Sequence, residues 1–218
     1  MNAKTLKHAV TSFFTAIKTK NIVPIEHIVD DAKVLDKKVA LITGGSGGIG
    51  YAIAKSFIES GCHVIITGTN AEKLKSCVEK LGDSSKGIFV SQKIAKYFVE
   101  NKIKGHILNI SSSTGGEPGW SAYRISKQAI ENLTLGLAQK LSPYGIFVNG
   151  IAPGSTATNL LNYKDGDSIA TRDNVIGRMV MPDKIATYAK MLVSDLGNMV
   201  VGETIYISGG RGKLDNRK

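Results

Sequence analysis

The feature that most limits how this chain can fold is a short apolar run that ends in a cluster of glycines. Residues 39–42 read Val-Ala-Leu-Ile, residues 43–50 read Thr-Gly-Gly-Ser-Gly-Gly-Ile-Gly, and a helix-like stretch follows to Phe57. A continuous apolar run of this length is typical of a strand that is buried on both faces of a parallel sheet. A second apolar run lies at residues 64–66. The segment therefore predicts a strand, a tight turn, a helix and a second strand.

Further apolar runs at residues 107–110, 146–148 and 205–207 are expected to be strands that helices separate. This alternation predicts an α/β fold: a Rossmann-type doubly wound parallel sheet in three α/β/α layers. One stretch departs from the alternation. The helices expected at residues 71–81 and 90–100 are joined only by a turn, and no strand is predicted between them.

We expect residues 1–36 to form an N-terminal extension and residues 37–218 to form one Rossmann-fold domain. Apolar residues of the extension fall near helical spacing among lysines, which predicts a helix. A basic amphipathic helix can contact a membrane or a partner. The preferred interpretation is that it packs on its own domain or on a neighbouring subunit. The apolar positions are Leu6, Val10, Phe13, Phe14 and Ile17.

Charge and cysteine content narrow the function classes. The formal net charge is +10, but the lysines are spread along the chain, which favours a solvated surface over nucleic-acid binding. Cys62 and Cys77 are too far apart for a Cys-x-x-Cys pair, so we expect free thiols in a reducing compartment and no metal site. No apolar run reaches the length of a membrane span. We therefore expect a cytoplasmic protein.

The glycine turn suits a pyrophosphate, because glycines allow a tight turn, close approach of the backbone and close packing of helix on strand. The helix that follows offers unpaired N–H groups to the phosphates. At the end of the second strand, where an NAD site usually has an acid, residues 67–70 read Thr-Gly-Thr-Asn, with no acid and no arginine. A 2′-phosphate would not be repelled there, and Thr69, Asn70 or Lys73 could bond to it. The cofactor is therefore expected to be NADP or NAD, with NADP favoured.

Tyr123 and Lys127 are four residues apart, so on one helix they share a face. A free phenol has a pKa of about 10, and a nearby ammonium group favours the phenolate. This makes Tyr123 a candidate acid or base. The alternative is an ordinary pair on an amphipathic helix, and the neighbouring motifs argue against it.

Taken in order, these motifs resemble the short-chain dehydrogenase/reductase family over residues 38–211. The matching segments are Thr43-Gly44-x-x-x-Gly48-x-Gly50, Asn109-Ile110-Ser111-Ser112, Tyr123-x-x-x-Lys127, Pro153-Gly154 with Thr158 after it, Gly177-Arg178-Met179 and Ser208-Gly209-Gly210.

The resemblance implies an NAD(P)-dependent oxidoreductase that interconverts a secondary alcohol and a ketone. Tyr123 would be the acid or base, Lys127 would also hold the nicotinamide ribose, and Ser112 would bond the substrate oxygen. Ser111 or Ser113 are alternatives for this serine. The family also implies a homo-oligomer, a dimer or tetramer, joined through the helix of Tyr123 and the helix before it. The expected cofactor-binding residues are Thr43, Gly44, Ser46, Gly47, Gly48, Ile49, Gly50, Thr69, Asn70, Tyr123, Lys127, Pro153, Gly154, Thr156 and Thr158.

The sequence departs from the family near Lys86 and Gly87, where the family has two more strands and a helix. That region carries an Asn-Asn-Ala-Gly turn and a catalytic asparagine, and neither is found here. Without the family's fourth strand, the first strand would keep unpaired backbone groups unless it closed against the fifth. Either the natural protein has further residues at this point, or it is a shortened variant.

Three functions are therefore compared. An active oxidoreductase is preferred, because Ser112, Tyr123 and Lys127 are all present. A non-catalytic nucleotide-binding or scaffold protein of the same fold is the alternative, and a nucleic-acid binder rests on charge alone. The substrate is expected to contact residues 159–175, whose mixed character fits many small molecules.

Overall fold

The computed structural model describes residues 33–68, 70–81, 85–87 and 94–214. Four 3₁₀ turns lie between or beside the main elements there: η1 (Ser113–Gly116), η2 (Ser142–Tyr144), η3 (Asn159–Leu161) and η4 (Asp195–Gly197). The strands and α-helices, in chain order, are β1 (Val39–Thr43), α2 (Gly48–Glu59), β2 (His63–Thr67), α3 (Ala71–Leu81), β3 (Ser85–Gly87), α4 (Ile94–Glu100), β4 (Gly105–Ile110), α5 (Ala122–Leu141), β5 (Ile146–Pro153), α6 (Pro182–Val193) and β6 (Thr204–Ile207).

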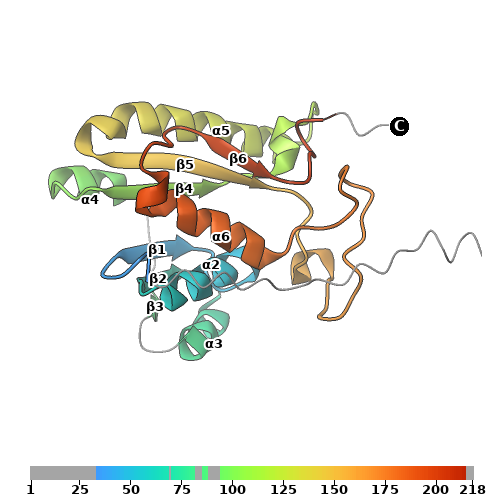
Figure 1. The fold of residues 1–218 in the computed structure, drawn as a ribbon, viewed down its shortest axis with the longest axis horizontal. Helices are drawn as coiled ribbons and strands as arrows, with labels where there is room; N and C mark the ends of the chain where they lie inside the picture. The colour runs from blue at the N-terminus through green and yellow to red at the C-terminus, as the bar shows by residue number, and fades with distance from the viewer. Residues whose placement is uncertain (1–32, 69, 82–84, 88–93, 215–218) are drawn as a thin grey trace, which may run out of the picture.

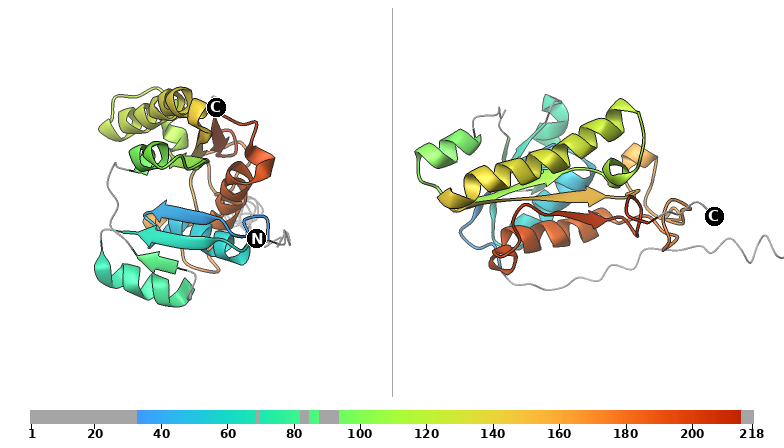
Figure 2. Two further views of the ribbon diagram at one scale, coloured as in Figure 1. Left: turned by 90° about the vertical axis from the view of Figure 1, so that its left-hand side faces the viewer. Right: turned by 90° about the horizontal axis from the view of Figure 1, so that it is seen from above.

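The strands pair in parallel, but they form two sheets (Figure 1). One sheet has the order β1-β2-β3 and the other β4-β5-β6. In the part of the chain that the structure describes, no ladder joins β1 to β4. Figure 2 shows the two sheets apart, with β1 as the strand of its sheet that lies nearest the other one. The expected unpaired first strand is therefore present, and it has not closed against the strand that follows α4.

Helices cover the sheets in the predicted three-layer arrangement. On one side α2, α3 and α6 pack on β2, β5 and β6 in a single hydrophobic cluster. On the other side α4 and α5 pack on β4 and β5. The parallel strands and the two helical layers confirm the predicted fold class. None of the described helices is both long and apolar enough to cross a membrane.

The prediction that β1 is buried on both faces is wrong. Val39 is 69% exposed, and Leu41 is only half-buried. Successive strand residues point to opposite faces, so these two side chains lie opposite Ala40 and Ile42, which join the core. The described helices that could cover this second face, α4 and α5, pack on the other sheet. No described helix therefore covers this face of β1, which the sequence pattern predicted to be buried.

The expectation of no strand between the two consecutive helices is also wrong. Residues 85–87 form β3, which pairs in parallel with β2 at residues 64–66. The strand order β1-β2-β3 therefore contains a counterpart of the family's third strand, and within the described residues the fourth has none. A three-residue strand with the sequence Ser-Lys-Gly carries no apolar signal, which is why periodicity did not find it. The following helix begins, within the described residues, at Ile94.

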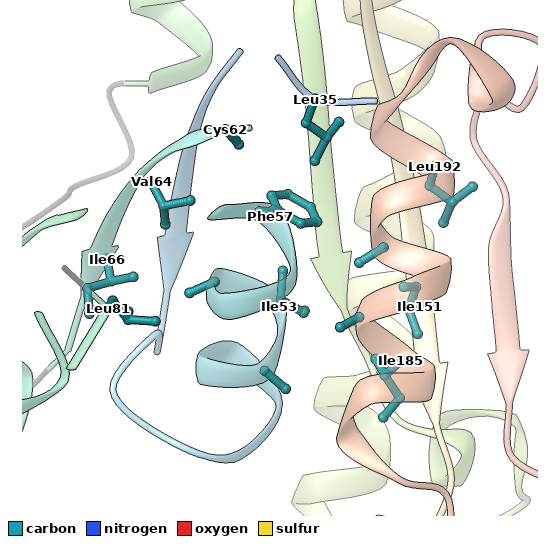
Figure 3. Close-up of a cluster of buried hydrophobic side chains, with 14 of the residues drawn as sticks. Leu35, Ile53, Phe57, Cys62, Val64, Ile66, Leu81, Ile151, Ile185 and Leu192 are labelled. Carbon is teal, nitrogen blue, oxygen red and sulfur yellow. The ribbon is translucent and has the colours of Figure 1, made fainter. Parts of the chain in front are cut away.

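The two sheets are joined by side chains rather than by backbone hydrogen bonds. Ile53 and Phe57 of α2 share one buried cluster with Ile185 and Leu192 of α6 and with Ile151 of β5. Figure 3 shows Ile53 and Phe57 of α2 beside α6, which carries Ile185 and Leu192. The contact between α2 and α6 therefore fixes how the glycine turn of one sheet sits beside the strand ends of the other.

The N-terminal extension falls mostly outside the described residues, so its expected helix is not observed. Its last part belongs with the domain, because Leu35 is 1% exposed and lies in the same cluster as α2 and α6. The Leu35 N–H donates to the Ser60 carbonyl over 3.0 Å.

Candidate functional site

The glycine turn joins β1 to α2. Gly44 has a φ of 68°, in the left-handed region that favours glycine. A Cβ on Gly45 would lie 2.6 Å from the Ile66 side chain, and one on Gly50 would overlap the Gly44 carbonyl. Thr43 and Gly44 are both exposed at this end of the strand. The turn is therefore packed tightly against β2, whereas Thr43 and Gly44 are open to solvent.

The start of α2 offers unpaired N–H groups. Gly47 is the N-cap in an extended conformation, no side chain caps the helix, and its first turn holds no acidic residue. The Lys73 Nζ lies 3.1 Å from where a Cβ on Gly47 would stand. Free N–H groups, the positive end of the helix dipole and an ammonium group favour a phosphate. The predicted residues Gly47, Gly48 and Ile49 therefore fit the pyrophosphate of a dinucleotide.

The end of β2 forms the second part of the predicted cofactor site. The Ser46 Oγ lies 2.7 Å from where a Cβ on Gly68 would stand, so the glycine turn and the end of β2 are in contact. Asn70 is exposed, and its Oδ1 accepts from the Lys73 backbone N–H over 2.8 Å. Thr69 lies outside the described residues. The described residues 67, 68 and 70 carry no acid, whereas Glu72 follows in the first turn of α3.

The loop after β5 supplies the third part. Pro153 ends the strand, and the Gly154 N–H donates to the last residue of β6 over 2.9 Å. Thr156 is buried, and its Oγ1 donates to the Gly154 carbonyl over 2.9 Å. Thr158 Cγ2 lies 3.4 Å from where a Cβ on Gly48 would stand. Predicted cofactor residues from both sheets are therefore brought together despite the missing strand.

Three consecutive serines follow β4, and their burial differs. Ser111 and Ser113 are 4% and 1% exposed, respectively, whereas Ser112 is half-buried. The Ser112 side chain caps η1: its Oγ accepts from the Thr114 N–H over 3.3 Å. Of the three alternatives, Ser112 is the most exposed to solvent.

Tyr123 and Lys127 lie in the first two turns of α5, which Ser121 caps by accepting from the Arg124 N–H. The Lys127 Nζ lies 5.6 Å from the centre of the Tyr123 ring. It also donates to the Ile110 carbonyl over 3.5 Å, which ties it to the end of β4. Tyr123 is 56% exposed. A phenol open to solvent and beside an ammonium group can exchange a proton with a bound molecule.

The serine segment rests on the same turn of α5. A Cβ on Gly115 would lie 3.1 Å from the Lys127 carbonyl carbon and from the Gln128 backbone nitrogen. This close approach places η1, and with it Ser112, beside the helix that carries Tyr123. The structure thus brings the three predicted catalytic residues to one end of β4.

An ion-pair network beside this site was not predicted. Arg211 Nε donates to Glu117 Oε1 over 2.7 Å, and Arg124 lies 2.9 Å from the other oxygen of Glu117. Arg211 also bonds Ser155 and Asp173, each over 3.1 Å. The network joins the chain after β6, the segment before α5 and the expected substrate-contacting residues. No local pattern could reveal it, because its members are far apart in the sequence.

A second unpredicted contact lies under α5. The Tyr206 hydroxyl of β6 donates to the Glu131 carboxylate, with both oxygens at 2.9 Å. Burial of the phenol, together with the hydrogen bond that it donates to Glu131, raises the pKa of Tyr206 well above its usual range. Tyr206 therefore remains the donor in this pair.

The thiols match a passive role. Cys62 and Cys77 are both free. Burial raises the pKa of the Cys62 thiol to about 11, so it holds its proton and reacts poorly. Among the described residues, no group of histidine, cysteine and acidic side chains is placed to hold a metal ion.

Family comparisons agree with this geometry. A family model described as short chain dehydrogenase matches residues 38–93, and one described as enoyl-(acyl carrier protein) reductase matches residues 83–211. The 3-oxoacyl-[acyl-carrier-protein] reductase FabG of Rickettsia felis is 30% identical over 236 residues, which cover 81% of this chain and 97% of that protein. The L-rhamnose 1-dehydrogenase (NADP(+)) of Thermoplasma acidophilum is 28% identical, covering 79% of this chain and 95% of that protein.

Solved structures show the same fold. A 3-ketoacyl-(acyl-carrier-protein) reductase from Brucella melitensis, complexed with NADH, has a TM-score of 0.69 at 23% identity and covers 82% of this chain and 99% of its own. A putative gluconate dehydrogenase from Agrobacterium tumefaciens has a TM-score of 0.73 at 20% identity, covering 84% and 100%.

The comparisons also bear on the missing strand. The match to the Rickettsia felis protein spans 236 residues, more than the 218 of this chain, although only 81% of this chain takes part. That relative therefore contains residues with no counterpart here. The two family models meet within residues 83–93, beside the point where the sequence departs from the family.

Proposed function

This chain belongs to the short-chain dehydrogenase/reductase family, and on that premise we propose that it reduces the ketone of a 3-oxoacyl thioester to a secondary alcohol. The reaction class follows from Ser112, Tyr123 and Lys127. The thioester follows from the relatives, several of which are named as 3-oxoacyl-[acyl-carrier-protein] reductases.

Three side chains act in the proposed reaction, and Lys127 would also hold the nicotinamide ribose. A reduced nicotinamide, when bound, would supply the hydride for the ketone carbon. Ser112 Oγ donates a hydrogen bond to the ketone oxygen and orients it. Tyr123 gives its hydroxyl proton to that oxygen as the charge develops. The Lys127 ammonium stabilises the phenolate that remains, until solvent returns a proton to Tyr123.

The observation that carries this proposal is the contact between Tyr123 and Lys127, 5.6 Å from ring centre to Nζ. Replacing Tyr123 with phenylalanine keeps the ring and removes the proton. Turnover of NADPH with a 3-oxoacyl thioester should fall by about 100-fold or more, with little change in cofactor affinity. Tyr144 is a matched control, because it is 55% exposed and lies in η2 at the other end of α5. Undiminished activity in Tyr123→Phe would refute the mechanism.

We further propose NADP as the preferred form of the cofactor. The exposed Asn70, the Lys73 ammonium beside Gly47 and the absence of an acid in residues 67–70 support it. Because the Lys73 ammonium lies beside Gly47 at the turn proposed to hold the pyrophosphate, Lys73→Ala should raise the KM for both cofactors, and by several-fold more for NADPH than for NADH. Equal changes for both cofactors would contradict the assignment.

The second candidate function is nucleotide binding without catalysis. The open edge of β1 favours it, because the region that carries the family's catalytic asparagine has no counterpart here. Titration of the purified chain with NADPH, followed by an assay with several ketones, separates the two functions. Binding without turnover of any ketone would favour the second.

The proposal extends to assembly and compartment. We propose a homo-oligomer joined through α5, whose Ile125, Leu133 and Leu135 side chains are more than half exposed. Light scattering that gives the mass of one chain would refute it. The two free thiols fit the reducing cytoplasm, and export of the natural protein from the cell would contradict that location.

A further inference from the structure

Glu131 joins three parts of the molecule around the site. It lies on α5 one turn after Lys127, and both of its oxygens lie 2.9 Å from the Tyr206 hydroxyl of β6. Oε1 also accepts from Ser111 Oγ over 3.2 Å. The same Oγ lies 2.9 Å from the Lys127 carbonyl. One carboxylate therefore ties α5 to β6 and to the residue that precedes Ser112.

The serine segment rests directly on this contact. A Cβ on Gly115 would lie 2.9 Å from Glu131 Oε1, and a Cβ on Gly116 would lie 2.7 Å from the Tyr206 hydroxyl. Both glycines belong to η1, which Ser112 caps. Because no side chain separates η1 from the pair, a shift of the pair moves η1 and Ser112 with it.

The hydrogen bond is shared by both oxygens of the carboxylate. The Tyr206 hydroxyl lies 2.9 Å from each of them, so either oxygen can accept its proton. The Lys213 ammonium lies 4.0 Å from the centre of the Tyr206 ring and covers it. The contact between Glu131 and Tyr206 therefore holds α5 against β6.

We propose that Glu131 is a positioning residue, which sets Ser112 against Tyr123 and Lys127 by holding Tyr206 and Ser111 in place. Its carboxylate acts through Ser112 and not on the reacting atoms. This role rests on the proposed function, because it gives Ser112 a substrate oxygen to orient. Misplacement of a reacting group by about 1 Å can cost about 100-fold in rate, so a small shift of η1 would be visible in kcat.

Three variants test the proposal in the full chain. Glu131→Ala removes the acceptor of the Tyr206 hydroxyl and leaves the Ser111 hydroxyl with the Lys127 carbonyl as its acceptor. Glu131→Gln keeps an oxygen that can accept from Tyr206. Thr134→Val is the matched control: Thr134 is fully buried on the same helix and accepts from Asn109 Nδ2 over 2.9 Å, so its loss weakens the contact of α5 with β4 away from η1.

Glu131→Ala should lower kcat for a 3-oxoacyl thioester by about 10- to 100-fold and leave the KM for NADPH within about twofold. Glu131→Gln should recover most of kcat, and Thr134→Val should keep it. Hydrogen exchange of the Gly115 and Glu117 amides, which bond to Ser112 and Thr114 carbonyls, should be faster in Glu131→Ala alone. This second readout needs no activity.

The outcomes separate the two claims. An unchanged kcat in Glu131→Ala, or an equal loss in Thr134→Val, would overturn the positioning role. If the unaltered chain reduces no ketone, the proposed function fails. Hydrogen exchange alone then decides the role of Glu131. Unchanged exchange at Gly115 and Glu117 in Glu131→Ala would then overturn it, and faster exchange confined to that variant would support it.

Discussion

Replacing Ile185 with alanine tests how the two halves of the molecule are held together. Ile185 lies on α6, is fully buried and belongs to the cluster that α6 shares with α2. Because no strand ladder joins β1 to β4 in the described residues, this cluster carries the contact between the sheets. Truncation at this position should therefore loosen the sheet that contains β1, although Ile185 is not part of it.

The expected cost follows from the buried carbon atoms. Isoleucine loses three side-chain carbons on truncation to alanine, at about 0.8 kcal/mol each, which gives about 2.4 kcal/mol for transfer. The cavity left behind adds to this, so the free energy of unfolding should fall by about 2–5 kcal/mol. Urea denaturation measures this loss.

Ile146→Ala is the matched control. Ile146 is also fully buried, but it lies in the cluster that α4 and α5 form with β4 and β5. Both variants should lose similar overall stability. Hydrogen exchange of the β2 amides should become faster in Ile185→Ala and change little in Ile146→Ala. Equal acceleration of β2 in both variants would mean that the sheets open as one unit, and the reasoning would be refuted.

Two further predictions concern pH and the ion-pair network. Burial lowers the pKa of His106 below its usual value of 6.5, so the unfolded chain binds the proton first and stability should fall as pH drops below about 6.5. Burial raises the pKa of Cys62 from 9.0 to about 11, so stability should fall again as pH rises through that window. Thermal denaturation measured across pH checks both expectations. His106→Leu should flatten the acid side of the profile of stability against pH, and Cys62→Ala should flatten its alkaline side. Unchanged profiles would contradict these assignments. Glu117→Gln should lower the free energy of unfolding by about 1–3 kcal/mol, because the Glu117 carboxylate bonds both Arg124 and Arg211. Urea denaturation measures this loss, and a value under about 0.5 kcal/mol would show that the network contributes little to stability.

Much of the fold could be predicted from local patterns. The glycine turn and the apolar runs predicted β1, α2 and β2, because each pattern lies within a few residues of the element that it specifies. The spacing of Tyr123 and Lys127 placed both on one helix, as the structure has them. Accessibility then distinguishes Ser112 from its neighbours, which spacing alone left open.

The remaining features depend on contacts between distant segments. β3 forms because β2 offers it a partner, and its own residues carry no strand pattern. Val39 is exposed because the described helices that could cover its face of β1 pack on the other sheet, which an apolar run cannot indicate. The carboxylates of Glu117 and Glu131 find their partners about 90 and 75 residues away, respectively. Such pairs are visible only once the chain is folded.

The central claim is that the glycine turn still holds a nicotinamide cofactor although the strand beside β1 is missing. Calorimetric titration of the chain with NADPH tests it most directly, with Gly50→Ala and Gly136→Ala for comparison. A Cβ on Gly50 would overlap the Gly44 carbonyl, whereas one on Gly136 meets nothing within 4 Å. The account predicts saturable one-site binding by the unaltered chain and by Gly136→Ala, and a loss of about tenfold or more in affinity for Gly50→Ala, which is about 1.4 kcal/mol. A folded, unaltered chain that binds no NADPH, or a Gly50→Ala variant that binds it equally well, would contradict the account.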